Sequence, residues 1–234
     1  MRVLALIGAL GDGSPTLWVE TMAAILIRAQ RLNDVDSLLV LECIIHAAAD
    51  EALHYEARQG LYEAAIARDL PAIARLFLSI SPAVAVPTQL KKQLGPERRL
   101  IPTGRLLTLG ERKSLARTHD REKLGKMIAD PHPAVVTILL DNPHITELDV
   151  VRIAAMRPAV PEALAKVAAH TKWSVRHAIK RALVLNPSTP LADAIRIATT
   201  LRATELAELA ADVSLPEPLR LHAAELRAAT RHGA

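Results

Sequence analysis

The chain repeats part of its own sequence after 44 residues, and this repeat constrains the fold more than any other feature. Residues 139–143 (Leu-Leu-Asp-Asn-Pro) match residues 183–187 (Leu-Val-Leu-Asn-Pro), and residues 149–154 match residues 193–198 without a gap. Repeats of this length occur in helical arrays, in which each unit buries its apolar stripe against its neighbours. The second half of the chain is therefore predicted to be a stack of helical hairpins.

Each copy of the repeat contains an Asn-Pro step, which predicts the end of a helix. Proline disfavours the helical conformation of the residue before it, so one helix should end near Asn142 and another near Asn186. Thr146 and Thr189 follow a few residues later, where either hydroxyl could cap the next helix. The step therefore predicts a turn between antiparallel helices.

Apolar residues recur at helical spacing along nearly the whole chain, and we find no succession of alternating strands bounded by hairpin turns. Aromatic residues make up only 2% of the chain, so Ala, Leu, Ile and Val must fill the core, which favours close-packed helices. The predicted fold class is all-α. The expected helices cover residues 15–31, 35–57, 59–67, 70–80, 109–118, 120–129, 133–141, 147–156, 161–170, 172–185, 190–201, 203–211 and 216–229.

The prolines suggest how the chain is divided. Residues 82–107 contain four prolines and a basic cluster, and they show the least regular pattern. We therefore expect an N-terminal helical segment at residues 1–81, a proline-rich basic linker at 82–107 and a repeat domain at 108–234.

Two segments have the sequence of a capping box, in which a hydroxyl and a glutamate satisfy each other's backbone donors. They are Thr108 with Glu111 and Ser214 with Glu217. Each predicts the start of a helix.

The Asn142-Pro143-x-x-Thr146 and Asn186-Pro187-x-Thr189-Pro190 motifs, followed by helices rich in Leu and Ile, resemble HEAT/armadillo-like repeats, including the leucine-rich-variant type. The likeness covers about residues 108–229. It implies a right-handed α-solenoid of helical repeats, with the N-terminal half as a helical cap or extension. Proteins of this class are mostly binding scaffolds, so the resemblance also implies a non-catalytic adaptor that binds another protein.

The pattern most typical of an enzyme consists of Glu42, His46, Asp50 and His54, which are spaced four residues apart. On one continuous helix they could hold a metal ion, and an enzyme that uses this face is one hypothesis. A carboxylate-bridged metal bundle needs a second Glu-x-x-His pair on another helix, and only one such pair, Glu51 with His54, is found. We expect instead an ordinary polar helix face, no metal, no cofactor and no enzymatic activity.

Positive charge gathers in the middle of the chain, where residues 91–126 carry a net charge of +7. Lys172, Arg176 and Lys180 form a second basic stripe at a spacing of four residues. The alternative function is therefore nucleic-acid binding through these two regions. The candidate contacts in the first region are Lys91, Lys92, Arg98, Arg99, Arg112 and Lys113.

The leading hypothesis is a scaffold whose partner lies on the face built by the helices around residues 147–156, 172–185 and 190–201. Helical phase predicts exposed side chains there, and Trp and Arg are enriched at binding hot spots. The residues expected to contact the partner are Arg152, Arg157, Trp173, Arg176, Lys180 and Arg196. Trp173 could instead fill the core between repeats.

Two further features indicate the compartment. The sequence contains one cysteine, Cys43, in an apolar setting, which fits a reducing environment. No apolar run approaches the roughly 18 residues that a membrane span needs. We therefore expect a soluble, cytoplasmic protein without a membrane span.

Overall fold

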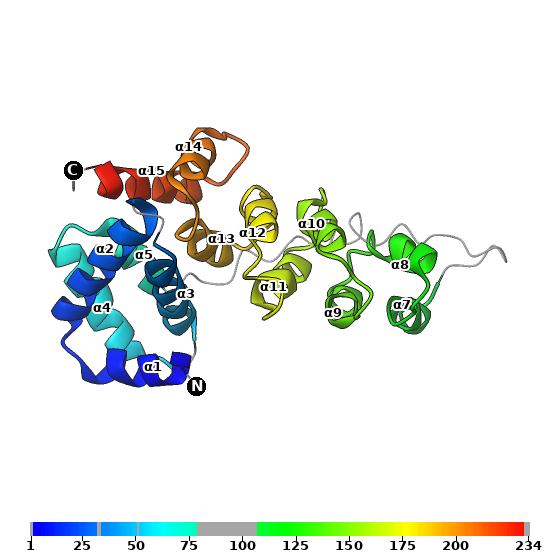
Figure 1. The fold of residues 1–234 in the computed structure, drawn as a ribbon, viewed down its shortest axis with the longest axis horizontal. Coiled ribbons are helices and arrows are strands. Elements are labelled where there is room, and N and C mark those ends of the chain that lie inside the picture. Colours follow the sequence, from blue (N-terminus) through cyan, green and yellow to red (C-terminus); the bar gives the residue numbers. More distant parts are fainter. Residues whose placement is uncertain (1, 32–33, 51, 79–106, 232–234) are drawn as a thin grey trace. The chain divides into compact units, whose positions relative to one another are not determined.

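The computed structural model describes residues 2–31, 34–50, 52–78 and 107–231, and this part of the chain is helical throughout, with no strand (Figure 1). The all-α prediction is therefore confirmed. The contacts divide the chain into two compact units. Unit 1 comprises residues 1–81 and 195–234, and unit 2 comprises residues 82–194.

Unit 1 combines helices from both ends of the chain around an aliphatic core. Its helices are α1 (Arg2–Asp12), α2 (Pro15–Arg31), α3 (Val35–Ala49), α4 (Tyr55–Ala67), α5 (Pro71–Phe77), α14 (Ala203–Ala211) and α15 (Glu217–Arg231). Helix α2 packs against α3 and α4, while α15 packs against α14, α5 and α2. Leu10, Met22, Leu41 and Leu61 are fully buried at the centre, as the aliphatic composition requires.

The corner between α1 and α2 depends on Gly13. The indole Nε1 of Trp18 donates to the carbonyl of Ala9 at 3.0 Å, across this corner. A Cβ atom at residue 13 would collide with that indole, so only glycine leaves the ring enough room. Helix α1 itself was not among the expected helices.

Unit 2 consists of six short helices whose alternate members pack together. They are α7 (Leu109–Ala116), α8 (Arg121–Met127), α9 (Pro133–Asp141), α10 (Glu147–Ala155), α11 (Pro161–Ala169) and α12 (His177–Val184). Helix α9 contacts both α7 and α11, and α10 contacts α12. The helices therefore form two rows, α7–α9–α11 and α8–α10–α12 (Figure 1). Helix α13 (Leu191–Ala198) spans the boundary between the units.

Two buried asparagines bind the ends of neighbouring helices in unit 2. The side-chain amide of Asn142, just after α9, donates to the carbonyls of Ala116 and Thr118 at 2.9 and 3.0 Å. Asn186 donates in the same way to Ala154 and Met156, at 2.8 and 2.9 Å. The last carbonyls of a helix have no partner within it, so each asparagine satisfies acceptors that α7 or α10 leaves open.

The capping predictions succeed at two positions and fail at two. Thr108 forms the expected capping box with Glu111, and Thr146 caps α10 with Asp149 at its third position. Ser214 instead bonds to Asp212, and α15 begins at Glu217, too late for a box at Ser214. Thr189 donates its hydroxyl to the carbonyl of Leu183, and α13 begins only at Leu191.

Two of the expected helices have the wrong extent. The helix predicted at residues 35–57 ends at Ala49, where the backbone of Asp50 turns to an extended conformation, and α4 begins at Tyr55. The helix predicted at 172–185 begins only at His177, because residues 171–175 form turns.

The contact units do not follow the boundaries of the expected division, which stays a prediction. Helices α14 and α15 belong to unit 1, whereas the sequence placed them in the repeat domain at residues 108–234. Nearly all of the expected linker at 82–107 lies outside the described residues.

Candidate functional site

Bonds at both ends show that α10 and α12 run parallel, and an ion pair places the start of α8 beside the start of α10. At the starting ends, Arg121 of α8 pairs with Asp149 of α10 at 2.7 Å, and Arg176, just before α12, lies 4.0 Å from Glu147 of α10. At the finishing ends, Asn186 after α12 bonds to Ala154 of α10. Equivalent turns of α10 and α12 therefore lie beside one another, and α8 precedes them in the same row (Figure 1).

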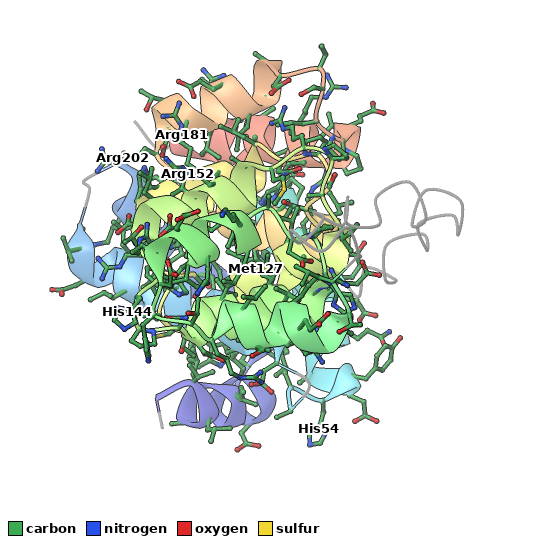
Figure 2. All side chains as sticks on the ribbon, turned by 90° about the vertical axis from the view of Figure 1, so that its right-hand side faces the viewer. His54, Met127, His144, Arg152, Arg181 and Arg202 are labelled. Carbon is green, nitrogen blue, oxygen red and sulfur yellow. The ribbon has the colours of Figure 1, made fainter. Side chains whose placement is uncertain are left out.

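This alignment brings together three exposed cations from residues that are far apart in the sequence. Each of the three helices carries one basic residue in its last turn. The residues are Lys126, Arg152 and Arg181, here called the basic row. Figure 2 shows Arg152 and Arg181 on the same side of unit 2. Helices α10 and α12 pack against each other, so the last turns that carry Arg152 and Arg181 are neighbours.

The middle of the basic row combines charge with exposed apolar surface. Leu148 lies one turn before Arg152 on α10, and 59% of its surface is exposed. Within the described part of the chain, no ion pair or hydrogen bond involves the Arg152 guanidinium. This arginine is therefore available to an anion, with an aliphatic side chain beside it.

A buried carboxylate joins α8 to α10 at the starting ends of these helices. The carboxylate of Asp149 is buried and accepts bonds from Arg121 and from the Thr146 hydroxyl, at 2.7 Å each. Burial alone would raise the pKa of Asp149, but these bonds outweigh it and lower the pKa to about 2. Asp149 therefore stays ionised near neutral pH and fixes α8 against α10.

Trp173, expected on the partner-binding surface, is a core residue. Its side chain is 3% exposed, and its indole Nε1 donates to the carbonyl of Leu140 at 2.9 Å. It fills the core beside the end of α9, in line with the alternative interpretation of Trp173 as a core residue. Only its neighbour reaches the surface, where the Lys172 ammonium lies 4.2 Å from the ring centroid.

Among the other predicted contact residues, Lys180 is also buried. It is 8% exposed, and burial lowers the pKa of its ammonium to about 8. The expectation that Lys180 is exposed is therefore wrong. Arg196 is half-buried, burial lowers its pKa, and it belongs to unit 1, whereas the others belong to unit 2.

Arg152, Arg157 and Arg176 are exposed, as predicted. The guanidinium of Arg157 donates to the carbonyl of Leu185, and that of Arg176 lies near Glu147. Arg152 therefore has the fewest competing contacts of the three.

Of the six candidate nucleic-acid contacts in the first basic region, the structure describes only Arg112 and Lys113. Arg112 is 8% exposed and donates to both carboxylate oxygens of Asp130 at 2.9 Å, so it does not face a ligand. Lys113 is half-buried on the same helix. The remaining candidates, Lys91, Lys92, Arg98 and Arg99, lie outside the described residues.

The four residues of the metal-binding hypothesis, Glu42, His46, Asp50 and His54, are not assembled on one helix. Asp50 ends α3 and His54 precedes α4, so the four residues do not share one helix as the spacing implied. His46 lies 3.9 Å from Glu42, which is the ordinary contact between side chains four residues apart. In residues 2–31, 34–50, 52–78 and 107–231, no three His, Cys, Asp or Glu side chains come together as a metal site.

Sequence reasoning missed Arg181, Lys126 and Leu148 as members of a shared surface. A basic residue in the last turn of a helix complements the helix dipole, and the sequence alone indicated this position for Arg181 and Lys126. The missing information was that α8, α10 and α12 form one row, because this decides which helices are neighbours (Figure 1).

Comparisons of the chain with family models, with curated proteins and with solved structures find no match. No helix in the described part of the chain is long and apolar enough to cross a membrane.

Proposed function

We propose that this protein is a non-catalytic scaffold of HEAT/armadillo-like repeats and that unit 2 binds an acidic segment of another protein along the basic row. The observation that carries the proposal is the presence of Lys126, Arg152 and Arg181 in the last turns of three helices of one row. Exposed cations on successive helices are complementary in charge to an extended acidic segment.

The α-solenoid arrangement is part of this proposal. Alternate helices pack together, and Asn142 and Asn186 make equivalent bonds 44 residues apart. Trp173, which follows α11, donates to a carbonyl of α9 in the same row. These contacts support a unit in which each repeat stacks on the previous one, so that exposed positions recur as lines along the array.

A protein partner fits this surface better than nucleic acid. Leu148 adds exposed apolar area beside Arg152, and apolar area with arginine is typical of protein interfaces. Burial of Arg112 and Lys180 also removes two of the cations that the nucleic-acid hypothesis required.

The test is affinity capture from native lysate at physiological salt, with and without nuclease, followed by mass spectrometry. Wild-type protein is compared with Arg152→Glu/Arg181→Glu and with Lys166→Glu. Lys166 is the matched control, because it is exposed in the last turn of α11, in the other row. We expect a nuclease-resistant partner that the double variant loses and the control keeps, with affinity reduced about tenfold or more.

Two outcomes would contradict the proposal. If capture disappears with nuclease, the surface binds nucleic acid and affinity should fall steeply with salt. If the double variant keeps the partner while its circular dichroism is unchanged, the partner binds elsewhere on the protein.

A further inference from the structure

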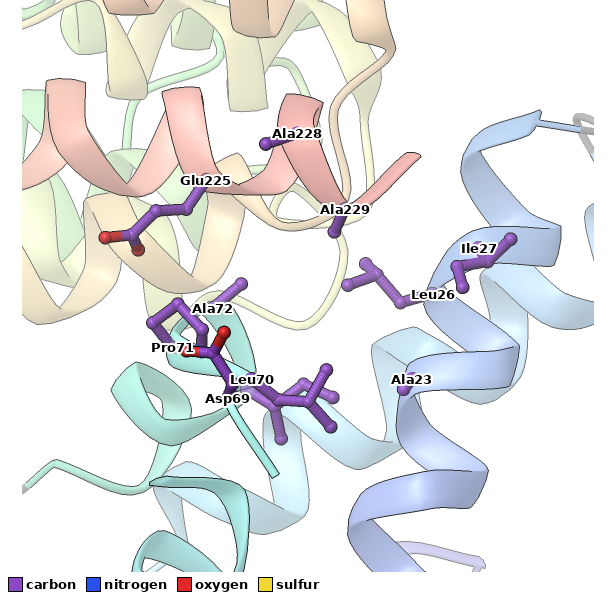
Figure 3. A pocket seen from close by; sticks show the side chains of 11 residues that line it. Ala23, Leu26, Ile27, Asp69, Leu70, Pro71, Ala72, Glu225, Ala228 and Ala229 are labelled. Carbon is purple, nitrogen blue, oxygen red and sulfur yellow. The ribbon is translucent and has the colours of Figure 1, made fainter. Parts of the chain in front are cut away.

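Unit 1 contains a pocket of about 510 Å³ between α2, the turn from α4 to α5, and α15 (Figure 3). Its walls are mainly aliphatic and include Leu26 and Ile27 of α2, Leu70 and Ile73 near α5, and Ala229 of α15. The volume lies within the roughly 300–1,000 Å³ of sites that hold small molecules. The pocket is therefore large enough for a small ligand with an apolar body.

Two carboxylates give the pocket a polar side. Asp69 and Glu225 both line it, and Figure 3 shows them on the side of Pro71, whereas Leu26 and Ile27 lie opposite. Both oxygens of Glu225 already bind Arg75, at 2.7 and 2.8 Å. Asp69 is exposed, and among the described residues no ion pair or hydrogen bond involves its carboxylate. The polar side therefore has an excess of negative charge.

The position of Asp69 is fixed by the backbone. The residue has a φ of 53°, in the left-handed region, directly after the last turn of α4. The amide of Leu70 donates to the carbonyl of Ala65 at 2.9 Å, the bond that closes a helix of this kind. Glycine is the usual residue here, so Asp69 places a carboxylate at the pocket where the fold itself would favour glycine.

We propose that this pocket binds an aliphatic amine: the hydrocarbon chain lies against α2, and the ammonium group pairs with Asp69. Apolar walls favour a hydrocarbon body, and the unpaired carboxylate selects a cation over a neutral or anionic head group. A fatty acid of the same length is disfavoured, because its carboxylate would meet those of Asp69 and Glu225. This inference does not depend on the proposed function of unit 2.

The test compares three ligands of equal chain length, octylammonium, octanol and octanoate, by isothermal titration calorimetry on the full chain. Methyl NMR of Ile73 and Ala229 locates the binding site. We expect octylammonium to bind one to one, octanol to bind more weakly and octanoate not to bind. Equal binding of all three ligands would overturn the proposal, as would octylammonium binding without shifts at Ile73 and Ala229.

Two variants test separately whether binding needs the charge of Asp69 and whether it needs the volume of the pocket. Asn tolerates a left-handed backbone as Asp does, so Asp69→Asn should weaken octylammonium binding about fivefold and leave octanol binding unchanged. Ala23→Phe should fill the pocket and abolish binding of both ligands. The control is Ala24→Phe, because Ala24 is exposed and does not line the pocket, and this variant should bind both ligands like the wild type. Unchanged octylammonium affinity in Asp69→Asn, or in a folded Ala23→Phe, would overturn the assignment.

Discussion

Arg75 and Glu225 form a two-point ion pair across 150 residues of sequence, with both nitrogen–oxygen distances below 2.9 Å. The pair joins α5 to α15, so the helix near the end of the chain is bound to the N-terminal bundle. Both side chains are largely shielded, at 22% and 28% exposure, which strengthens the pair relative to one in open solvent. Unit 1 therefore depends on both ends of the chain.

The stability of unit 1 should fall in acid because of His222, one turn before Glu225. His222 is fully buried, and burial, together with nearby Arg75, lowers its pKa to about 3. In the unfolded chain the same imidazole has a pKa of about 6.5, so between these values the unfolded state binds more protons. Acidification from about pH 7 to about pH 5 should therefore reduce the free energy of unfolding by about 2 kcal/mol through this group.

This pH dependence can be measured by urea unfolding of wild type and His222→Gln at several pH values. The buried imidazole lies 3.1 Å from the Thr199 hydroxyl, and glutamine can keep that bond without titrating. The variant should show a shallower loss of stability below about pH 6.5. Identical pH profiles would mean that His222 does not carry the effect.

Asn186→Ala should destabilise unit 2 by about 2–3 kcal/mol, because it removes the donors for the carbonyls of Ala154 and Met156. Thermal or urea unfolding measures the loss. The control is Thr137→Ala, on an exposed residue that bonds only within its own helix, and it should change stability by less than about 0.5 kcal/mol. Equal effects of the two variants would contradict the role assigned to the asparagine.

The buried pair of Arg112 and Asp130 predicts a larger loss. Arg112→Met leaves the Asp130 carboxylate buried without its cation, which should cost about 3–5 kcal/mol of stability. The double variant Arg112→Met/Asp130→Asn should recover part of this loss. Lys126→Met, which breaks the exposed pair with Glu122, should cost less than about 1 kcal/mol in the same unfolding assay.

Two glycine substitutions should act in opposite directions. Gly13→Ala forces a methyl group into the Trp18 indole and should destabilise the protein by about 1–3 kcal/mol. Gly125→Ala, inside α8 with open space around it, should stabilise the protein by up to about 1 kcal/mol. Differential scanning calorimetry of both variants checks the signs, and a stabilising Gly13→Ala would refute the close approach of Trp18.

Local patterns predicted local structure well. The capping residues Thr108 and Thr146 and the helix from Pro133 to Asp141 follow from neighbouring residues, and the structure has them as expected. The break at Asp50 was missed because the apolar and polar spacing continues through it. No sequence signal comparable to an Asn-Pro step marks that turn.

The surfaces were predicted less well, because exposure depends on which helices meet. Lys180 and Arg112 belong to charged stripes that resemble solvated faces, yet packing buries both. Arg181 was overlooked although it lies next to Lys180 in the sequence. The 44-residue repeat indicated stacking, but it did not specify which side of each helix the neighbouring repeat would cover.

The asparagine bonds of unit 2 also show that its helix ends are satisfied in different ways. The carbonyls at the ends of α7 and α10 are bonded by an amide from a later helix hairpin. At the end of α12 the arrangement reverses: the carbonyl of Leu185 accepts from Arg157, which precedes it, and that of Leu183 accepts from Thr189. Both carbonyls thus accept from a donor other than an asparagine amide, so side chains of unit 2 itself satisfy the end of α12.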